Sequence, residues 1–107
     1  MAMPNQVITI LARHIGKGNG ISVEILARQL GIAPRQVRKH ITALRLRDDG
    51  HAICGMPKDG YYMAETPEEL KATCDFLHNR AMHSLALKAK LMKIPLADLL
   101  GQLHLPT

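Results

Sequence analysis

Aromatic residues are scarce in this sequence. Its 107 residues include no tryptophan, and only Tyr61, Tyr62 and Phe76 carry aromatic rings. A hydrophobic core must therefore be aliphatic, built from Leu, Ile, Val, Met and Ala. Proteins that bind single-stranded nucleic acid usually hold the bases by stacking them on aromatic side chains, so this scarcity argues against that class of function.

Cysteine and long apolar runs are also lacking. Cys54 and Cys74 are too few for a disulfide framework. The apolar stretch near the N-terminus is interrupted by Asn5, Gln6 and Arg13, so it predicts neither a signal peptide nor a membrane span. We therefore expect a protein of the reducing cytoplasm that does not associate with membranes.

The residue patterns that serve catalysis and cofactors are missing as well. The glycine-rich segment 16–20 lacks the preceding strand and the following Lys-Ser/Thr of a phosphate-binding loop. The best candidate for a metal is Cys74 with His78 and His83, but a closed zinc site needs four ligands. No plausible set of nucleophile, base and orienting residue is present. We expect no catalytic residues, no metal site, no cofactor and no enzymatic activity.

Positive charge is concentrated in the first part of the chain, and the formal net charge is +5. Residues 1–64 contain nine Lys and Arg against four Asp and Glu, whereas residues 65–107 contain five of each. This asymmetry suggests a polyanionic partner for the first part and a different role for the second. We divide the chain accordingly into a domain of residues 1–64 and a tail of residues 65–107.

Residues 22–45 have the pattern of two helices joined by a tight turn. Ser22 can accept a backbone N–H at the start of the first helix. Gly31 can take the positive φ that ends this helix, with Ile32 turned back into the core. Pro34 suits the first position of the next helix, where no amide donor is needed. The pattern predicts a helix-turn-helix whose second helix fades near Arg47.

The second helix of this pair is amphipathic. Its apolar residues Val37, Ile41 and Leu44 recur at i, i+4 and i+7 and share one face. The opposite face carries Arg35, Lys39 and Thr42, flanked by Gln36 and Arg38. Such a face suits the major groove of DNA, although a solvated helix that packs only on its neighbours would look similar. The ordered helix-ending and helix-starting signals favour the DNA interpretation.

A β-hairpin is predicted after this helix. A turn at residues 48–50 leads to two short strand-like pieces, 52–54 and 61–63, around a loop that carries Lys58 and Asp59. Directly after a recognition helix, such a hairpin is a wing that contacts phosphates or the minor groove. A further helix is expected at about residues 5–15, and Ile21 is expected to pair briefly as a strand.

Three segments carry a family resemblance. Leu30-Gly31-Ile32, residues 38–45 and Pro57-Lys58-Asp59-Gly60-Tyr61 resemble the DNA-binding domain of the bacterial biotin operon repressor family. The resemblance covers residues 5–64 and implies a winged-helix fold and DNA binding, without the biotin chemistry. The pattern of residues 60–70, followed by one long helix, is also similar to small winged-helix proteins of bacteriophages and prophages.

The residue pattern of the tail predicts one long helix and one short terminal helix. Thr66-Pro67-Glu68-Glu69 is a strong helix start, and no Pro or Gly follows until Pro95. The short helix runs from Pro95 to about Leu103. The leucines expected at an interface are Leu77, Leu85, Leu91, Leu96, Leu99, Leu100 and Leu103. Monomers seldom expose large apolar patches, so these leucines predict a homodimer or a protein partner, unless the tail folds back on its own core.

The fold class expected from these patterns is mainly α with a small β-hairpin: a winged helix-turn-helix, a long C-terminal helix and a short terminal helix. We expect a homodimeric transcriptional regulator of bacterial or phage origin that binds specific double-stranded DNA. Arg35, Gln36 and Lys39 would contact base edges, while Arg38, Thr42, Arg45 and Lys58 would hold phosphates. Two alternatives are a phage replication accessory protein that binds an origin and a protein-interaction module, such as an inhibitor of a host factor, that does not bind DNA.

Overall fold

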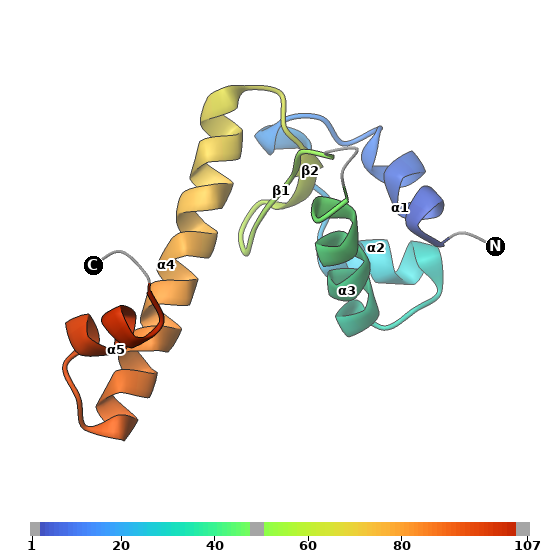
Figure 1. Ribbon diagram of the computed structural model, residues 1–107. Coiled ribbons are helices and arrows are strands. Elements are labelled where there is room, and N and C mark those ends of the chain that lie inside the picture. The colour runs from blue at the N-terminus through green and yellow to red at the C-terminus, as the bar shows by residue number, and fades with distance from the viewer. Residues whose placement is uncertain (1–2, 48–50, 105–107) are drawn as a thin grey trace. The chain divides into compact units, whose positions relative to one another are not determined.

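The computed structural model of the chain describes residues 3–47 and 51–104, so the turn expected at residues 48–50 lies outside the described residues. The described chain is mainly helical, with a small antiparallel hairpin and one long helix, as the sequence predicted (Figure 1). The elements are α1 (Met3–Leu11), the 3-10 turn η1 (Lys17–Asn19), α2 (Val23–Leu30), α3 (Pro34–Arg45), β1 (Ile53–Met56), β2 (Gly60–Met63), α4 (Pro67–Met92) and α5 (Leu96–Gln102). They form two compact units, residues 1–73 and 74–107.

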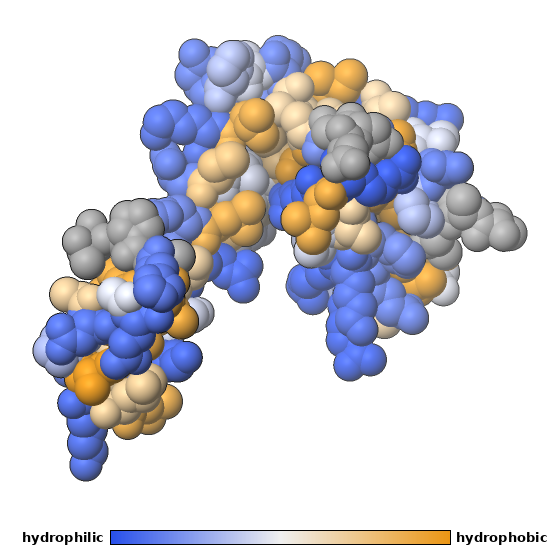
Figure 2. Space-filling model, viewed as in Figure 1, coloured by the Kyte–Doolittle hydropathy of each residue, from blue (hydrophilic) through white to orange (hydrophobic). Residues whose placement is uncertain are grey.

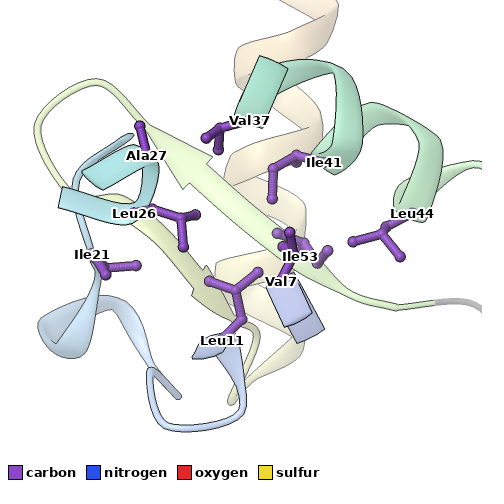
Figure 3. Close-up of a cluster of buried hydrophobic side chains, with 9 residues drawn as sticks. All are labelled: Val7, Leu11, Ile21, Leu26, Ala27, Val37, Ile41, Leu44 and Ile53. Carbon is purple, nitrogen blue, oxygen red and sulfur yellow. The ribbon is translucent and has the colours of Figure 1, made fainter. Parts of the chain in front are cut away.

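An aliphatic core joins the helices of the first unit to the hairpin. It comprises Val7, Leu11, Ile21, Leu26, Ala27, Val37, Ile41, Leu44 and Ile53, each at most 4% exposed (Figure 3). Burial of a side chain such as Leu or Val contributes about 1.5–3 kcal/mol. The core therefore fixes which face of α3 is turned inward.

The junction of α2 and α3 has the predicted end signals. The Ser22 hydroxyl accepts a backbone N–H of the first turn of α2 at 3.2 Å. Gly31 ends that helix at a φ of 71°, and Ile32 donates its N–H to the Ala27 carbonyl at 3.1 Å. This bond satisfies a carbonyl that would otherwise lack a partner at the helix end. Pro34 then begins α3, as expected.

The hairpin is longer than predicted, because both strands extend to the turn. Its register pairs Ile53 with Met63 and Met56 with Gly60. Gly60 has a φ of 73°, and a Cβ at this position would collide with the Ile21 carbonyl. On the other edge of β2, Ile21 and Tyr61 exchange two backbone hydrogen bonds of 2.8 Å. The brief strand pairing predicted for Ile21 is confirmed.

Helix α1 ends at Leu11, so the prediction that it continues to residue 15 is wrong. The backbone beyond it pairs with β2 instead. The Met63 N–H donates to the His14 carbonyl at 2.7 Å, and the Gly16 N–H donates to the Met63 carbonyl at 2.9 Å. These long-range hydrogen bonds override the helical spacing of the apolar residues, and they leave Ile15 47% exposed.

Helix α4 begins where the sequence predicted. Thr66 caps it by accepting the Glu69 N–H at 3.2 Å. The Glu69 carboxylate accepts the N–H groups of Glu65 at 2.8 Å and Lys17 at 2.9 Å. Thr73, 2% exposed, accepts the Gly55 N–H at 3.3 Å. The first unit therefore includes the first turns of α4, beyond the boundary that we drew after residue 64.

The second unit contains the rest of α4 and α5. The short helix folds back on the C-terminal half of α4, where Ala89, Leu99 and Leu100 are buried (Figure 1). The long helix predicted before Pro95 ends at Met92, and the short helix begins and ends within one residue of its predicted bounds. None of the helices in the described part of the chain has the length and hydrophobicity needed to span a membrane.

Candidate nucleic-acid interface

Helix α3 has one buried and one exposed face. Val37, Ile41 and Leu44 are at most 1% exposed and point into the core of the first unit (Figure 3). The exposed face carries the predicted contact residues Arg35, Gln36, Arg38, Lys39 and Thr42. The division into two faces that the sequence predicted is confirmed, because the three apolar residues recur once per helical turn.

Four of these side chains line one open depression. They are Arg35, Arg38, Lys39 and Thr42. Arg35 and Lys39 are one helical turn apart, and so are Arg38 and Thr42. Figure 2 shows hydrophilic residues gathered over α3. Residues 34–45 include no Asp or Glu, so the three positive charges of the depression have no acidic neighbour on their own helix. The depression therefore attracts anions.

The cations of the depression are available to a ligand. Within residues 3–47 and 51–104, no hydrogen bond or ion pair engages the side chains of Arg35, Arg38 or Lys39. Guanidinium and ammonium groups form their strongest hydrogen bonds with charged acceptors such as phosphate. The depression consequently offers phosphate or base acceptors a set of unused donors.

Gln36 forms a hydrogen bond within the protein that was not predicted from the sequence. Its Oε1 accepts the backbone N–H of Ala33 at 3.0 Å. Ala33 cannot cap α3 with its own side chain, and Gln36 therefore provides the reciprocal half of a capping arrangement. The side chain remains exposed on the polar face of the helix.

Arg45 is held against the hairpin. Its Nε donates to the Ile53 carbonyl at 2.8 Å, and its guanidinium carbon lies 5.9 Å from the centre of the Tyr61 ring. This half-buried side chain thus connects the end of α3 to both strands. The sequence gives no signal for the pair with Tyr61, because the two residues meet only once the hairpin folds back on the helix.

Lys58 lies exposed at the tip of the hairpin, as expected. The turn is closed by the Asp59 N–H, which donates to the Met56 carbonyl at 3.1 Å. The Asp59 carboxylate is turned inward, and its Oδ2 is buried without a hydrogen-bond partner among the described residues. Lys58 is therefore the more exposed of the two charged side chains at the tip, since Asp59 is half-buried.

The predicted interface leucines separate into three groups by their exposure. Leu99 and Leu100 are 1% and 2% exposed, because α5 packs them into the core of the second unit, and are not open to a partner. Leu85 and Leu96 are half-buried, whereas Leu77, Leu91 and Leu103 are exposed. Leu91 stands out at 85% exposed, and Leu87, which the sequence analysis missed, is 53% exposed.

The candidate metal ligands do not form a site in the described residues. Cys74, His78 and His83 are all exposed on α4. No three His, Cys, Asp or Glu side chains come together closely enough to hold a metal ion within the described ranges.

No protein-family model, curated protein or solved structure matches this chain. Its function must therefore be inferred from its own surfaces. These are the basic face of α3, the tip of the hairpin and the exposed leucines of the second unit.

Proposed function

We propose that this protein is a winged helix-turn-helix protein that binds specific double-stranded DNA and regulates transcription. Helices α2 and α3 form the helix-turn-helix, with α3 as the recognition helix and the β1–β2 hairpin as the wing. The observation that carries the proposal is the exposed face of α3. It holds three unengaged cations and no acidic residue, directly opposite three fully buried side chains.

The dimensions and chemistry of α3 suit the major groove. An α-helix with its side chains is about 10–12 Å across, and the groove is about 12 Å wide. Because the apolar face is buried, only the face with Arg35 and Lys39 can enter it. Arg38 and Thr42 are suited to the flanking phosphates, and Lys58 at the tip of the hairpin is suited to a phosphate or the minor groove.

Binding of the full chain to a random duplex library, repeated over a range of salt concentrations, tests the proposal. We expect one enriched sequence and an affinity that falls as salt rises, since binding to phosphates releases counterions. Absence of binding to any duplex, even at low salt, would contradict the proposal. The exposed leucines would then favour a module that binds only proteins.

Two substitutions distinguish base contacts from phosphate contacts. Arg35→Ala should cost about 1–3 kcal/mol on the preferred duplex and relax its sequence preference. Arg38→Ala should weaken binding to all duplexes alike and reduce the salt slope by about 1. Arg28→Ala is the matched control, because Arg28 is an exposed arginine on α2, away from the depression.

We also propose that a second copy of the chain covers the exposed leucines of the second unit. A single small DNA-binding module buries only about 600–1,000 Å² of its surface on DNA, which limits its specificity. A two-fold dimer presents two recognition helices to half-sites about 34 Å apart. Leu91, 85% exposed, is the most exposed of the leucines that we assign to this contact.

A further inference from the structure

The carboxamide of Gln36 is already used within the protein, although its side chain lies on the polar face of α3. Its Oε1 accepts the Ala33 N–H at 3.0 Å. Recognition of adenine by glutamine needs Oε1 for the N6 amino group and Nε2 for N7 at the same time. Because Oε1 faces the helix start, Gln36 would have to turn away from the Ala33 N–H to present both groups to one base edge.

The side chains that remain in the depression are mainly hydrogen-bond donors. Arg35, Arg38 and Lys39 carry only N–H groups, and Thr42 alone can also accept. In the major groove, guanine offers two acceptors, N7 and O6. Adenine offers only one acceptor, N7, beside an amino group that itself needs an acceptor. Cytosine presents only an amino group, and thymine offers a single acceptor beside its methyl group. This face of α3 is therefore complementary to guanine.

The spacing along the helix fits two such bases. Arg35 and Lys39 are four residues apart, which corresponds to about 6 Å of helix rise. Successive bases are about 3.4 Å apart along one DNA strand. The two side chains can therefore reach two base pairs that are separated by about two steps.

We infer that α3 recognises guanine. Each half-site contains two guanines about two base-pair steps apart, contacted by Arg35 and Lys39. Gln36 caps the helix and contacts no base. This inference rests on the proposed DNA binding and adds the identity of the recognised bases.

Base analogues test the inference on the full chain. After a salt titration establishes binding, each guanine of the selected duplex is replaced singly by 7-deazaguanine, which lacks the N7 acceptor but still pairs with cytosine. Each adenine is replaced in the same way by 7-deazaadenine. We expect about five- to tenfold weaker binding at the two guanines of each half-site, which corresponds to the loss of one hydrogen bond each, and less than about twofold at every adenine.

Protein variants assign each base to a side chain. Arg35→Ala and Lys39→Ala should each abolish the preference for guanine at one of the two positions. Gln36→Ala should leave the selected sequence unchanged, as should Gln29→Ala, a matched change of an exposed glutamine on α2. Gln36→Glu keeps an acceptor for the Ala33 N–H, so it preserves the capped helix if the alanine variant folds poorly. It too should retain the guanine preference.

Three results would overturn the inference, and they can be told apart. Sensitivity to 7-deazaadenine, with an altered preference in Gln36→Ala, would make Gln36 a base contact. Salt-dependent binding that ignores every analogue would restrict α3 to phosphates and leave the DNA-binding proposal intact. Absence of salt-dependent binding to any duplex would overturn the proposed function as well.

Discussion

Lys93 takes the left-handed backbone conformation that favours glycine, with a φ of 58°. The N–H of Ile94 donates to the Ala89 carbonyl and that of Lys93 to the Lys90 carbonyl, both at 3.1 Å, so the end of α4 is closed. Gly31 ends α2 with the same pair of bonds. A residue with a Cβ costs about 1–2 kcal/mol in this conformation, and lysine therefore stands at a strained position.

Lys93→Gly should stabilise the second unit by about 0.5–1 kcal/mol, because relief of the strain exceeds the entropy that glycine adds to the unfolded chain. Lys90→Gly, within the last turn of α4, should instead destabilise it by about 1 kcal/mol. Urea unfolding followed by circular dichroism measures both changes. A loss of stability in Lys93→Gly would mean that the lysine side chain supplies a contact outweighing the strain.

Glu69 stabilises the start of α4 through its charge. Hydrogen bonds from the N–H groups of Glu65 and then Lys17 lower the pKa of the Glu69 carboxyl below its usual value. A carboxyl whose pKa is lower in the folded state contributes stability above its unfolded pKa. That contribution decreases as the pH falls through the lower, folded-state pKa.

We therefore expect Glu69→Gln to be less stable than the wild type at neutral pH. Glutamine has one acceptor oxygen and keeps at most one of the two bonds. The difference in the free energy of unfolding should shrink as the pH falls below the ordinary pKa of glutamate, as measured by urea unfolding across acidic pH. Glu68→Gln controls for charge at the same helix end, and an equal, pH-independent loss in both variants would contradict the role of Glu69.

At the scale of elements, Arg45 fixes the hairpin to α3. Its Nε bond to the Ile53 carbonyl and its position over the Tyr61 ring connect one side chain to both strands. A hydrogen bond from a charged donor contributes about 1.5–3 kcal/mol, and a cation on an aromatic ring adds about 0.5–1 kcal/mol. Arg45 thus positions the hairpin that carries Lys58.

Arg45→Lys should keep the positive charge and lose the bond from Nε. We expect the free energy of unfolding to fall by about 1–2 kcal/mol. Amide exchange should become faster than in the wild type, and the increase should be larger in the hairpin than in α1 and α2. Arg28→Lys, the same change at an exposed residue of α2, should have little effect. Unchanged exchange in the hairpin of Arg45→Lys would show that its position depends on the core alone.

The element ends that the sequence predicted well are those marked by local signals. Ser22, Gly31 and Pro34 define the junction of α2 and α3, and Thr66 defines the start of α4, through bonds to residues a few positions away. The end of α1 was mispredicted because the backbone that follows the helix pairs with Met63, far along the chain. For the same reason Arg45 was predicted only as a phosphate contact. Pairing with a residue far along the chain leaves no local signal that marks where a helix ends.

At the scale of the whole molecule, the two units carry different surfaces. The first presents the basic face of α3, and the second presents exposed leucines along α4 together with Leu103. The charge distribution of the sequence predicted a basic first part of the chain, but the sequence could not show that Leu99 and Leu100 would be buried by α5. Only the leucines left outside that packing can join two copies of the chain.

Leu91→Lys tests whether the exposed leucines of the second unit join two copies of the chain. If two copies meet at this residue, each loses about 1.5–3 kcal/mol of apolar burial, and the dissociation constant of the dimer should rise more than about tenfold. Sedimentation velocity over a range of protein concentrations measures this shift.

Leu46→Lys is the matched control, since Leu46 is 78% exposed but belongs to the first unit. A wild-type protein that stays monomeric at high concentration, or equal shifts in both variants, would contradict the dimer. Binding to a single half-site should persist in Leu91→Lys, because α3 is unchanged.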